Sequence, residues 1–518
     1  MRTRNSFTSL VAAAALVVAT LLAAPAAHAA TSVERLAGAD RYATSAALSA
    51  AAYPDGADVV VVASGASFAD ALSAGPVAAQ WGGPLLLTHP DALPAATKTE
   101  LTRLAPSRIV IVGGTGAVSA AAEAQLAGYA SAVERIGGDN RYDTSTALVA
   151  RAFPAGAREV FVVTGADFPD ALSAGAYAAL REAPVLLASD SAAELPPLLR
   201  TLGAVSATIV GGPGAVSEDV ATLLRGAGVT VSRVQGADRY ETSQNLAAEF
   251  GQRAGAIIAS GAAFPDALSA VTLAAVRGEP VLLSSPLCAS EGFLGALETS
   301  GATRLTLAGG PAAIRGLVGS LTPCQSLADP RSLWVMVNKK NPLRPASYAP
   351  ATLRTVNLPG TGQMRPDAAT ALERLSAASV QAGAGPLCIN NGYRSYATQQ
   401  AVYADHVRAR GQAGADLISA RPSHSEHQTG WAVDVGAAQG GGCGFSAFGT
   451  TTQSRWVAAH AHEFGFIVRY PEGQTAVTGY VYEPWHLRFV GVELASDYAA
   501  SGLRTLEQYL GYPAAAGY

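Results

Sequence analysis

The chain has 518 residues, of which 49% are hydrophobic and 14% are charged, and its formal net charge at pH 7 is −4. This composition excludes a disordered chain, because the apolar residues suffice for several cores, and it provides no basic excess for a nucleic-acid partner. The length predicts several domains. Ala and Gly are abundant and Arg far outnumbers Lys, which suggests a genome of high GC content.

The N-terminal segment predicts a secretory signal peptide. A basic start precedes an apolar run at residues 10–24, and Ala27 and Ala29 form the A-x-A pattern of a cleavage site. We therefore expect residues 1–29 to be removed on export. The run is shorter than the roughly 20 residues of a membrane-spanning helix, and no later segment is long and apolar enough, so we expect no stable membrane span after cleavage.

Three sequence blocks then recur three times in the same order. The first block reads RLAGADRYATS, RIGGDNRYDTS and RVQGADRYETS in the three copies. The second reads SGASFADALSA, TGADFPDALSA and SGAAFPDALSA, and the third reads IVGGTGAVS, IVGGPGAVS and LAGGPAAIR. The period is domain-like, so we expect three units, at residues 33–130, 131–230 and 231–324.

Each unit is expected to have an α/β fold. Short β-branched runs such as DVVVVAS and RIVIVGG alternate with Ala-rich helical stretches, which is typical of a parallel sheet covered by helices. The Asp of each F-x-D-A-L-S-A block (Asp70, Asp170, Asp266) is placed to start a helix as an N-cap or first-turn acid. The glycine-rich turns lack both the G-x-G-x-x-G spacing and a Walker lysine, so they predict no nucleotide site.

The three blocks resemble the cell-wall-binding repeat 2 family of Gram-positive surface proteins, over about residues 33–324. The resemblance implies three Rossmann-like units that pack around a pseudo-threefold axis and hold an anionic wall polymer. Arg41, Arg141 and Arg239 are candidate ligands of that polymer, because a guanidinium forks onto phosphate or carboxylate. Alternatively, each pairs with the neighbouring Asp or Asn of its own motif. The third copy departs at its last block, where Arg315 replaces Ser, and this leaves the form of its final turn open.

Four cysteines lie in the chain, and none belongs to a C-x-x-C pair, so a thiolate zinc site is not expected. An even number of cysteines in an exported protein suggests disulfides. Of the three possible pairings, the domain organisation favours Cys288–Cys324 and Cys388–Cys443, because each pair then lies within one folding unit.

The repeats end at Cys324, and a different region follows. A short polar linker at residues 325–332 leads to a domain at residues 333–518. Six of the eight histidines of the chain lie within residues 406–486. Just before them, the segment GYRSYATQ places Arg394 in a loop that enters a predicted helix.

This region contains a candidate metal site. The segments SEHQTGWAVD and YEPWH supply His427, Asp434 and His486, and two His with one Asp form a sensible three-ligand set for Zn²⁺. Three protein ligands leave one position open for water, as in catalytic zinc sites. Glu483 is then placed to orient that water and take its proton. An H-E-x-x-H pattern fails at Phe466, and the other four histidines of the region are expected to be structural or to support the ligands.

The same segments resemble the zinc D-alanyl-D-alanine carboxypeptidases of the VanY type, in peptidase family M15, over about residues 333–492. The resemblance implies a compact α+β domain with an antiparallel sheet and one zinc ion on the three ligands named above. It makes Glu483 the general base and then the acid, and it gives Arg394 the role of stabilising the developing oxyanion or anchoring the substrate carboxylate. It also implies that Gln399 and Ser425 line the substrate site.

Together the two halves predict a secreted enzyme of the cell wall of a Gram-positive, high-GC bacterium. Its repeats would dock on the wall polymer, and its zinc domain would remove the C-terminal D-Ala from peptidoglycan stem peptides. The same zinc site could instead serve an L,D-carboxypeptidase or an endopeptidase. A wall-binding adhesin with an idle peptidase domain is the remaining alternative, and the complete set of ligands, Glu483 and Arg394 argues against it.

Overall fold

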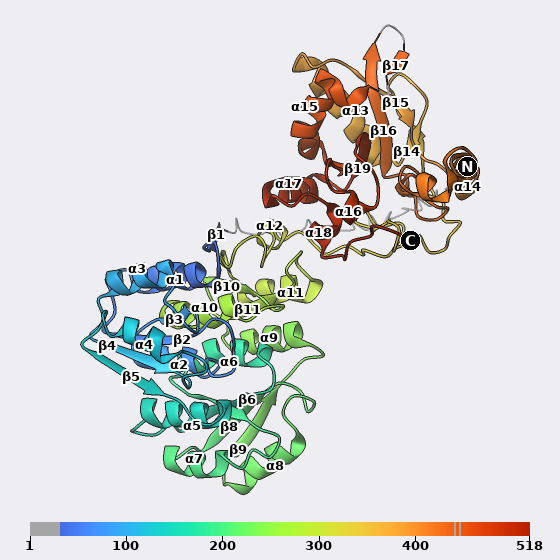
Figure 1. Ribbon diagram of the computed structural model, residues 1–518. Coiled ribbons are helices and arrows are strands. Elements are labelled where there is room, and N and C mark those ends of the chain that lie inside the picture. The colour runs from blue at the N-terminus through green and yellow to red at the C-terminus, as the bar shows by residue number, and fades with distance from the viewer. Residues whose placement is uncertain (1–31, 440–441, 445–446) are drawn as a thin grey trace, which may run out of the picture.

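A computed structural model describes residues 32–439, 442–444 and 447–518. The predicted signal peptide at residues 1–29 lies outside the described residues. The described chain forms two bodies, an N-terminal one drawn in blue to green and a C-terminal one in orange to red (Figure 1). None of the described helices combines the length and the apolar character that crossing a bilayer requires.

The N-terminal body contains three four-stranded sheets in which all paired strands run parallel. The first sheet has the order β3 (Leu85–Thr88), β2 (Val59–Ser64), β4 (Arg108–Val112) and β5 (Ala132–Ile136). The second has the order β7 (Val185–Ala188), β6 (Glu159–Thr164), β8 (Ser206–Val210) and β9 (Thr230–Val234). The third has the order β11 (Val281–Ser284), β10 (Gly255–Ser260), β12 (Arg304–Ala308) and β1 (Ser32–Leu36).

Each sheet is completed by the first strand of the next sequence copy. Strand β5 opens the second copy and pairs with β4, and β9 opens the third copy and pairs with β8. Strand β1, which opens the first copy, pairs with β12 of the third, from Ser32 opposite Arg304 to Leu36 opposite Ala308. The N-terminal strand therefore closes three units into a ring, and each sheet combines residues from two of the predicted units.

Helices separate and cover these sheets. They are α1 (Arg41–Ala52), α2 (Ala74–Gln80), α3 (Ala95–Leu104), α4 (Ala120–Leu126), α5 (Arg141–Ala152), α6 (Pro169–Leu180), α7 (Leu195–Leu202), α8 (Glu218–Gly226), α9 (Arg239–Ala248), α10 (Pro265–Arg277), α11 (Glu291–Ser300) and α12 (Gly316–Gly319). One helix from each unit, α2, α6 and α10, packs at the centre. There Gly75 lies so close to α10 that a Cβ atom would be 2.8 Å from Val271 Cγ1.

The C-terminal body is an α+β domain around an antiparallel sheet. The sheet has the order β15 (Leu387–Asn391), β16 (Ala432–Gln439), β19 (Glu483–Phe489) and β18 (Phe466–Tyr470), and β17 (Gly442–Gly444) pairs with β16. A separate two-stranded sheet joins β13 (Arg354–Thr355) to β14 (Gln363–Met364).

The helices of this domain flank the sheet. They are α13 (Pro366–Gln381), α14 (Tyr396–Asp416), α15 (Thr452–His460), α16 (Thr475–Thr478), α17 (Val492–Ser501) and α18 (Leu506–Leu510), with short 3-10 turns η1 (Glu426–Thr429), η2 (Phe448–Thr450) and η3 (Ala461–Phe464). Leu372 of α13 and Val457 of α15 belong to the same buried cluster as Val433 and Leu487 of the sheet. This is the antiparallel α+β fold that the sequence predicts.

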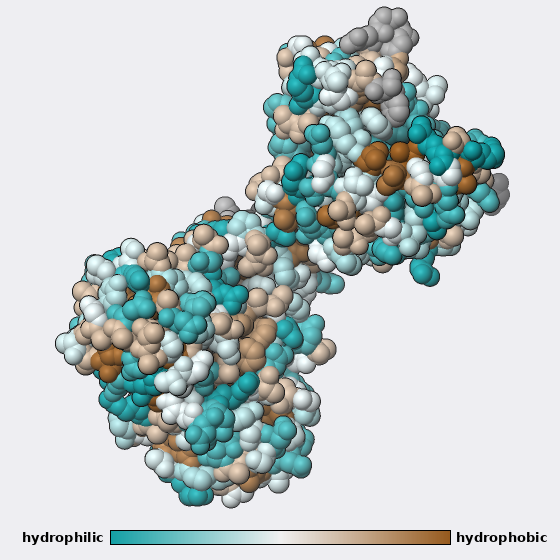
Figure 2. All heavy atoms as spheres, viewed as in Figure 1, coloured by the Kyte–Doolittle hydropathy of each residue, from teal (hydrophilic) through white to brown (hydrophobic). Residues whose placement is uncertain are grey.

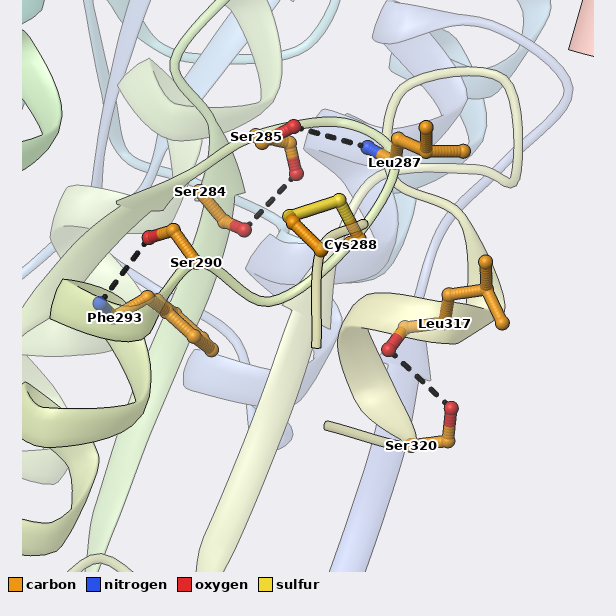
Figure 3. Close-up of a disulfide and its surroundings, with 9 residues drawn as sticks. Ser284, Ser285, Leu287, Cys288, Ser290, Phe293, Leu317 and Ser320 are labelled. Carbon is orange, nitrogen blue, oxygen red and sulfur yellow. Dashed lines mark hydrogen bonds between the residues drawn. A yellow bond between two sulfur atoms is a disulfide. The ribbon is translucent and has the colours of Figure 1, made fainter. Parts of the chain in front are cut away.

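Both bodies contain one disulfide. Cys288, in the loop after β11, is bonded to Cys324, and Cys388 of β15 is bonded to Cys443 of β17. These are the pairs that the sequence favours. Figure 3 shows the first disulfide beside Leu287 and Leu317, at the end of the ring nearest the C-terminal body.

Candidate metal centre

The strand register brings together the candidate metal ligands. Asp434 of β16 lies directly opposite His486 of the antiparallel neighbour β19, and residues that are opposite in such a pair share one face of the sheet. His427 lies in η1, just before β16. Gly430 ends η1 with φ 73°, a backbone conformation that favours glycine, and so lets the chain turn from η1 into the strand.

The donor atoms of these three buried side chains converge. His427 Nε2 lies 3.3 Å from Asp434 Oδ2, and His486 Nδ1 lies 3.1 Å from Asp434 Oδ1. All three donor atoms lie within 4.8 Å of one another. Two imidazole nitrogens and one carboxylate oxygen are a ligand set that Zn²⁺ accepts, with a fourth position left open. The residues present therefore fit a catalytic zinc ion.

Partners outside this set orient two of the ligands. His427 Nδ1 donates a hydrogen bond to the Gly392 carbonyl oxygen at 2.8 Å, which leaves Nε2 to face the other donors. Asn391, opposite Asp434 in the sheet, donates through Nδ2 to Asp434 Oδ2 at 3.1 Å. Such bonds hold a metal ligand in one tautomer and one orientation.

The third ligand is held by Glu426, a residue to which sequence reasoning assigned no role. His486 Nε2 lies 3.4 Å from Glu426 Oε2. The other oxygen of this fully buried carboxylate accepts hydrogen bonds from Arg469 Nε at 2.9 Å and from Arg488 Nη1 at 2.8 Å. The only signal in the sequence was the position of Glu426 beside His427, because its two arginines lie far along the chain.

The electrostatics follow from these contacts. Burial raises the pKa of Glu426, but the charges of Arg469 and Arg488 outweigh burial and hold that pKa well below its usual range. Burial disfavours the charged form of His486, but its hydrogen bonds to Asp434 and Glu426 outweigh this and raise the pKa of His486 to about 9. The buried carboxylates of Asp434 and Glu426 therefore favour the protonated form of His486.

Glu483 lies next to the ligands at the start of β19. Its Oε2 is 3.9 Å from His486 Nδ1, and its side chain lines the same cavity as the three ligands. Burial raises the pKa of Glu483 to about 8; the nearby His486 and Arg394 lower it and Asp434 raises it. A carboxyl group with such a pKa can both take up and release a proton near neutral pH.

Arg394 approaches the centre from the loop between β15 and α14. Its Nη2 lies 3.9 Å from Asp434 Oδ2, and its Nη1 donates to Gln399 Oε1 at 2.8 Å. Gln399 is completely buried and donates in turn to the Ala420 carbonyl oxygen at 2.6 Å. The structure corrects one expectation, because Gln399 lies behind Arg394 and does not line the cavity, whereas Ser425 does.

A cavity of about 570 Å³ opens onto these groups. Its far wall is the face of α14 that carries Thr398, Val402, His406 and Arg410, residues spaced four apart so that they share one side of the helix. His406, which the sequence left as structural or supporting, therefore belongs to the cavity wall. Four aromatic side chains also line the cavity (Tyr393, Tyr470, Tyr480 and Trp485).

The three repeat arginines occupy equivalent positions in the ring. Each is the first residue of its helix, and the preceding Asp or Asn caps that helix through backbone N–H groups (Asp40, Asn140, Asp238). Each arginine donates through Nη1 to a glycine carbonyl oxygen (Gly65, Gly165, Gly261). The Asp or Asn is thus used as a cap, and the arginine does not pair with it.

The arginines also link neighbouring copies. Their guanidinium groups lie 5.5 to 5.7 Å from the ring centres of phenylalanines in another copy (Arg41 on Phe264, Arg141 on Phe68, Arg239 on Phe168). The three phenylalanine rings contact one another, with centroids 5.5 to 6.0 Å apart. Three cations therefore surround an aromatic cluster where the three units meet.

Comparisons with known proteins agree with this division. The family model described as cell wall binding domain 2 (CWB2) matches residues 35–123, 135–221 and 233–318. The family model VanY, described as D-alanyl-D-alanine carboxypeptidase, matches residues 361–492.

Individual relatives match different shares of the chain. The N-acetylmuramoyl-L-alanine amidase LytC of Bacillus subtilis (strain 168) is 33% identical over 268 residues, which are 51% of this chain and 53% of that protein. The putative carboxypeptidase YodJ of the same strain is 35% identical over 192 residues, 36% of this chain and 69% of that protein. The solved structure of Cwp6 from Clostridium difficile has a TM-score of 0.53 and 25% identity, over 73% of this chain and 61% of that one. The chain thus spans about half the length of LytC.

Proposed function

We infer that this chain, which belongs to the CWB2 family through its repeats and to the VanY carboxypeptidase family through its C-terminal third, is a wall-docked zinc peptidase. We propose that it removes the C-terminal D-Ala from peptidoglycan stem peptides. The observation that carries the peptidase role is the convergence of His427, Asp434 and His486 in one cavity with Glu483 and Arg394. We assign this role to a domain at residues 333–518.

Three residues would hold the metal ion and two more would act on the substrate. When bound, a zinc ion would act as a Lewis acid on the scissile carbonyl and make water a stronger nucleophile at neutral pH. Glu483, in its ionised form, accepts the proton of the attacking water and then delivers it to the departing amine. Its buried position beside His486 keeps the carboxyl group close to the ligands and away from bulk water.

Arg394 supplies a fixed positive charge beside the reacting atoms. The side-chain Oε1 of Gln399 accepts a hydrogen bond from this guanidinium and holds it in place. A preorganised cation in a dry site stabilises a developing oxyanion more than one in water does. The same cation could instead anchor the terminal carboxylate of an exopeptidase substrate. Ser425 lines the cavity and offers a hydroxyl donor to the substrate.

The D,D-carboxypeptidase assignment is tested by mass spectrometry of defined muropeptides. A stem pentapeptide should lose one D-Ala, whereas a tetrapeptide and a cross-linked dimer should remain intact. Shortening of the tetrapeptide alone would indicate an L,D-carboxypeptidase, and cleavage of the dimer would indicate an endopeptidase. A zinc-loaded chain that cleaves none of them would favour the adhesin with an idle domain.

The repeats are proposed to hold an anionic wall polymer through Arg41, Arg141 and Arg239. The cyclic placement of these cations where three units meet supports this role. Replacing all three by Gln in the full chain should abolish its sedimentation with purified walls. The control replaces Arg200 and Arg225, which are exposed on α7 and α8, by Gln as well. This control should bind walls as strongly as the wild type. Undiminished binding by the first variant would refute the role.

Export and location follow from the same proposal. We propose that residues 1–29 direct secretion and that the chain then stays at the wall of a Gram-positive bacterium. The relatives above come from Bacillus and Clostridium and do not support the expected high-GC source, which rests on composition alone.

A further inference from the structure

The third repeat ends differently from the first two. In those copies Ser119 and Ser217 cap helices α4 and α8, each by accepting a hydrogen bond from a backbone N–H at 3.3 Å. In the third copy the equivalent residue is Arg315, which provides no side-chain cap for α12. The Gly316 N–H instead donates to Asp497 Oδ1 at 2.8 Å. Asp497 lies on α17 of the C-terminal body, so the cap comes from the other domain.

Arg315 itself contacts the same domain. Its guanidinium lies 5.1 Å from the ring centre of Tyr509 of α18. The Tyr509 hydroxyl donates to Asp497 Oδ2 at 2.6 Å, so one carboxylate joins α12, α17 and α18. The residue that departs from the repeat pattern is therefore the one that stacks on the neighbouring domain.

An apolar cluster lies behind these polar contacts. Cys288 and Leu317 of the third repeat share one buried cluster with Trp334, Leu494 and Leu506 of the C-terminal body. Figure 3 shows Cys288 and Leu317, two residues that the third repeat contributes to this cluster. In Figure 1, α12, α17 and α18 lie together at the junction, and Figure 2 shows the two bodies meeting through a neck that is narrower than either.

The predicted linker is part of this contact. Leu327 packs against the same cluster, and its carbonyl oxygen accepts a hydrogen bond from the Met336 N–H at 2.9 Å. Residues 325–332 are therefore held against folded structure on the side of the C-terminal body. A segment packed in this way does not act as a flexible spacer.

Most residues of the contact lie outside both family matches. The CWB2 match ends at residue 318, and the VanY match spans residues 361–492. Asp497 and Tyr509 follow the second match, and Trp334 lies between the two. Neither family by itself accounts for the contact, which depends on the joining of the two domains in this chain.

We propose that the ring and the peptidase domain form one rigid unit, docked through Arg315, Asp497 and Tyr509 over the apolar cluster. The loss of the serine cap in the third repeat is then an adaptation to the docked domain, because Asp497 replaces it. The consequence is a fixed orientation of the catalytic cavity relative to the wall-binding ring. This inference does not depend on which peptide the cavity cleaves.

Hydrogen exchange of the full chain tests the replaced cap. In Asp497→Ala, the amides of residues 316–319 should exchange about fivefold faster, the change expected when a helix loses its N-cap. Glu493→Ala is the matched control, because Glu493 is an exposed acid one turn earlier on α17, and it should leave this exchange unchanged. Adding Arg315→Ser to Asp497→Ala should restore protection, because the serine then caps α12 as in the first two copies.

Small-angle scattering of the same proteins tests the rigid unit. The wild-type profile should fit one fixed arrangement of the two bodies. The profile of Arg315→Ser with Asp497→Ala should require a range of relative orientations, although α12 is capped again. Wild-type scattering that requires many orientations would overturn the proposal. Exchange at residues 316–319 that Asp497→Ala does not alter would overturn the assigned cap.

Discussion

The two bodies of this protein differ in how their buried carboxylates are paired. In the ring, the carboxylates of Glu100 and Glu279 are buried, and each pairs with an arginine that is partly exposed. In the C-terminal body, Glu426, Arg469, Arg488 and Glu507 form one network whose side chains are wholly inaccessible to solvent. This network ends on His486, a candidate metal ligand.

That difference indicates what each body is built to do. Moving charges out of water costs several kcal/mol per ion, and their mutual attraction recovers it only in good geometry. An apolar core would stabilise a domain at least as well. The network therefore fits a body that must hold one ligand geometry, whereas the ring needs only to present similar surfaces from three copies.

The same network reaches the docked face. Glu507 lies on α18 between Leu506 and Tyr509, and its two oxygens accept hydrogen bonds from Arg469 at 2.7 and 3.0 Å. Arg469 in turn contacts Glu426. Continuous buried structure thus joins the domain contact to the candidate metal centre.

The largest effect is expected from removing a metal ligand. His427→Ala should lower zinc per chain and turnover together, because two remaining ligands hold the ion poorly. Elemental analysis beside an activity assay measures both quantities. His462→Ala, which changes a histidine outside the cavity lining, is the control and should retain both. A zinc-loaded His427→Ala protein would remove His427 from the ligand set.

The next effect tests the buried network directly. Glu426→Gln removes the negative charge between Arg469 and Arg488 and should lower the free energy of unfolding by about 3–5 kcal/mol. The amide cannot accept from both arginines and also from His486, so zinc affinity should fall by about 10- to 100-fold as well. Thermal unfolding and a zinc titration measure these changes. Wild-type values for both would show that the network is dispensable.

A smaller effect is expected at Gln399. Gln399→Ala removes the acceptor that holds Arg394, and misplacing a catalytic group can lower the rate by up to about 10²-fold. Zinc content should not change. Gln399→Glu keeps an acceptor for the guanidinium and should recover part of kcat/KM. A parallel loss of zinc in Gln399→Ala would mean that Gln399 supports the fold and does not specifically position Arg394.

The smallest effect is expected in the ring. Glu100→Gln removes a buried charge that accepts hydrogen bonds from Ser49 and from Arg103, whose side chain is 32% exposed, and should lower the free energy of unfolding by about 1–3 kcal/mol, less than Glu426→Gln. Thermal unfolding of Glu100→Gln and Glu426→Gln under the same conditions measures the difference in stability loss between the two bodies. Equal losses in the two variants would refute that contrast.

The three candidate metal ligands can be picked out from the sequence because they lie in short motifs. Asp434 lies on β16, and the register with β19 places His486 opposite it. The role of Glu426 could not be predicted from the sequence, because it depends on Arg469 and Arg488, which no motif connects to Glu426. The resemblance placed Gln399 in the substrate lining, whereas the structure buries it against Arg394, a contact that no motif reveals.

The repeats, too, could be predicted only in part from the sequence. Linear repetition predicts three α/β units, but it does not show that β1 completes the third sheet, because that pairing closes a ring in space. The Arg315 departure was visible in the sequence as a missing serine. Its compensation was not, because Asp497 lies in another domain.

We propose that Glu483 is the general base and that it is not a metal ligand. The direct test is zinc per chain, measured together with kcat on a D-Ala-D-Ala-terminated peptide, for Glu483→Gln. The amide is nearly isosteric but cannot take the proton, so zinc should stay bound while kcat falls by about 10²–10⁴-fold. A zinc-loaded Glu483→Gln enzyme with near wild-type turnover would contradict the mechanism, and a zinc-free one would make Glu483 a ligand.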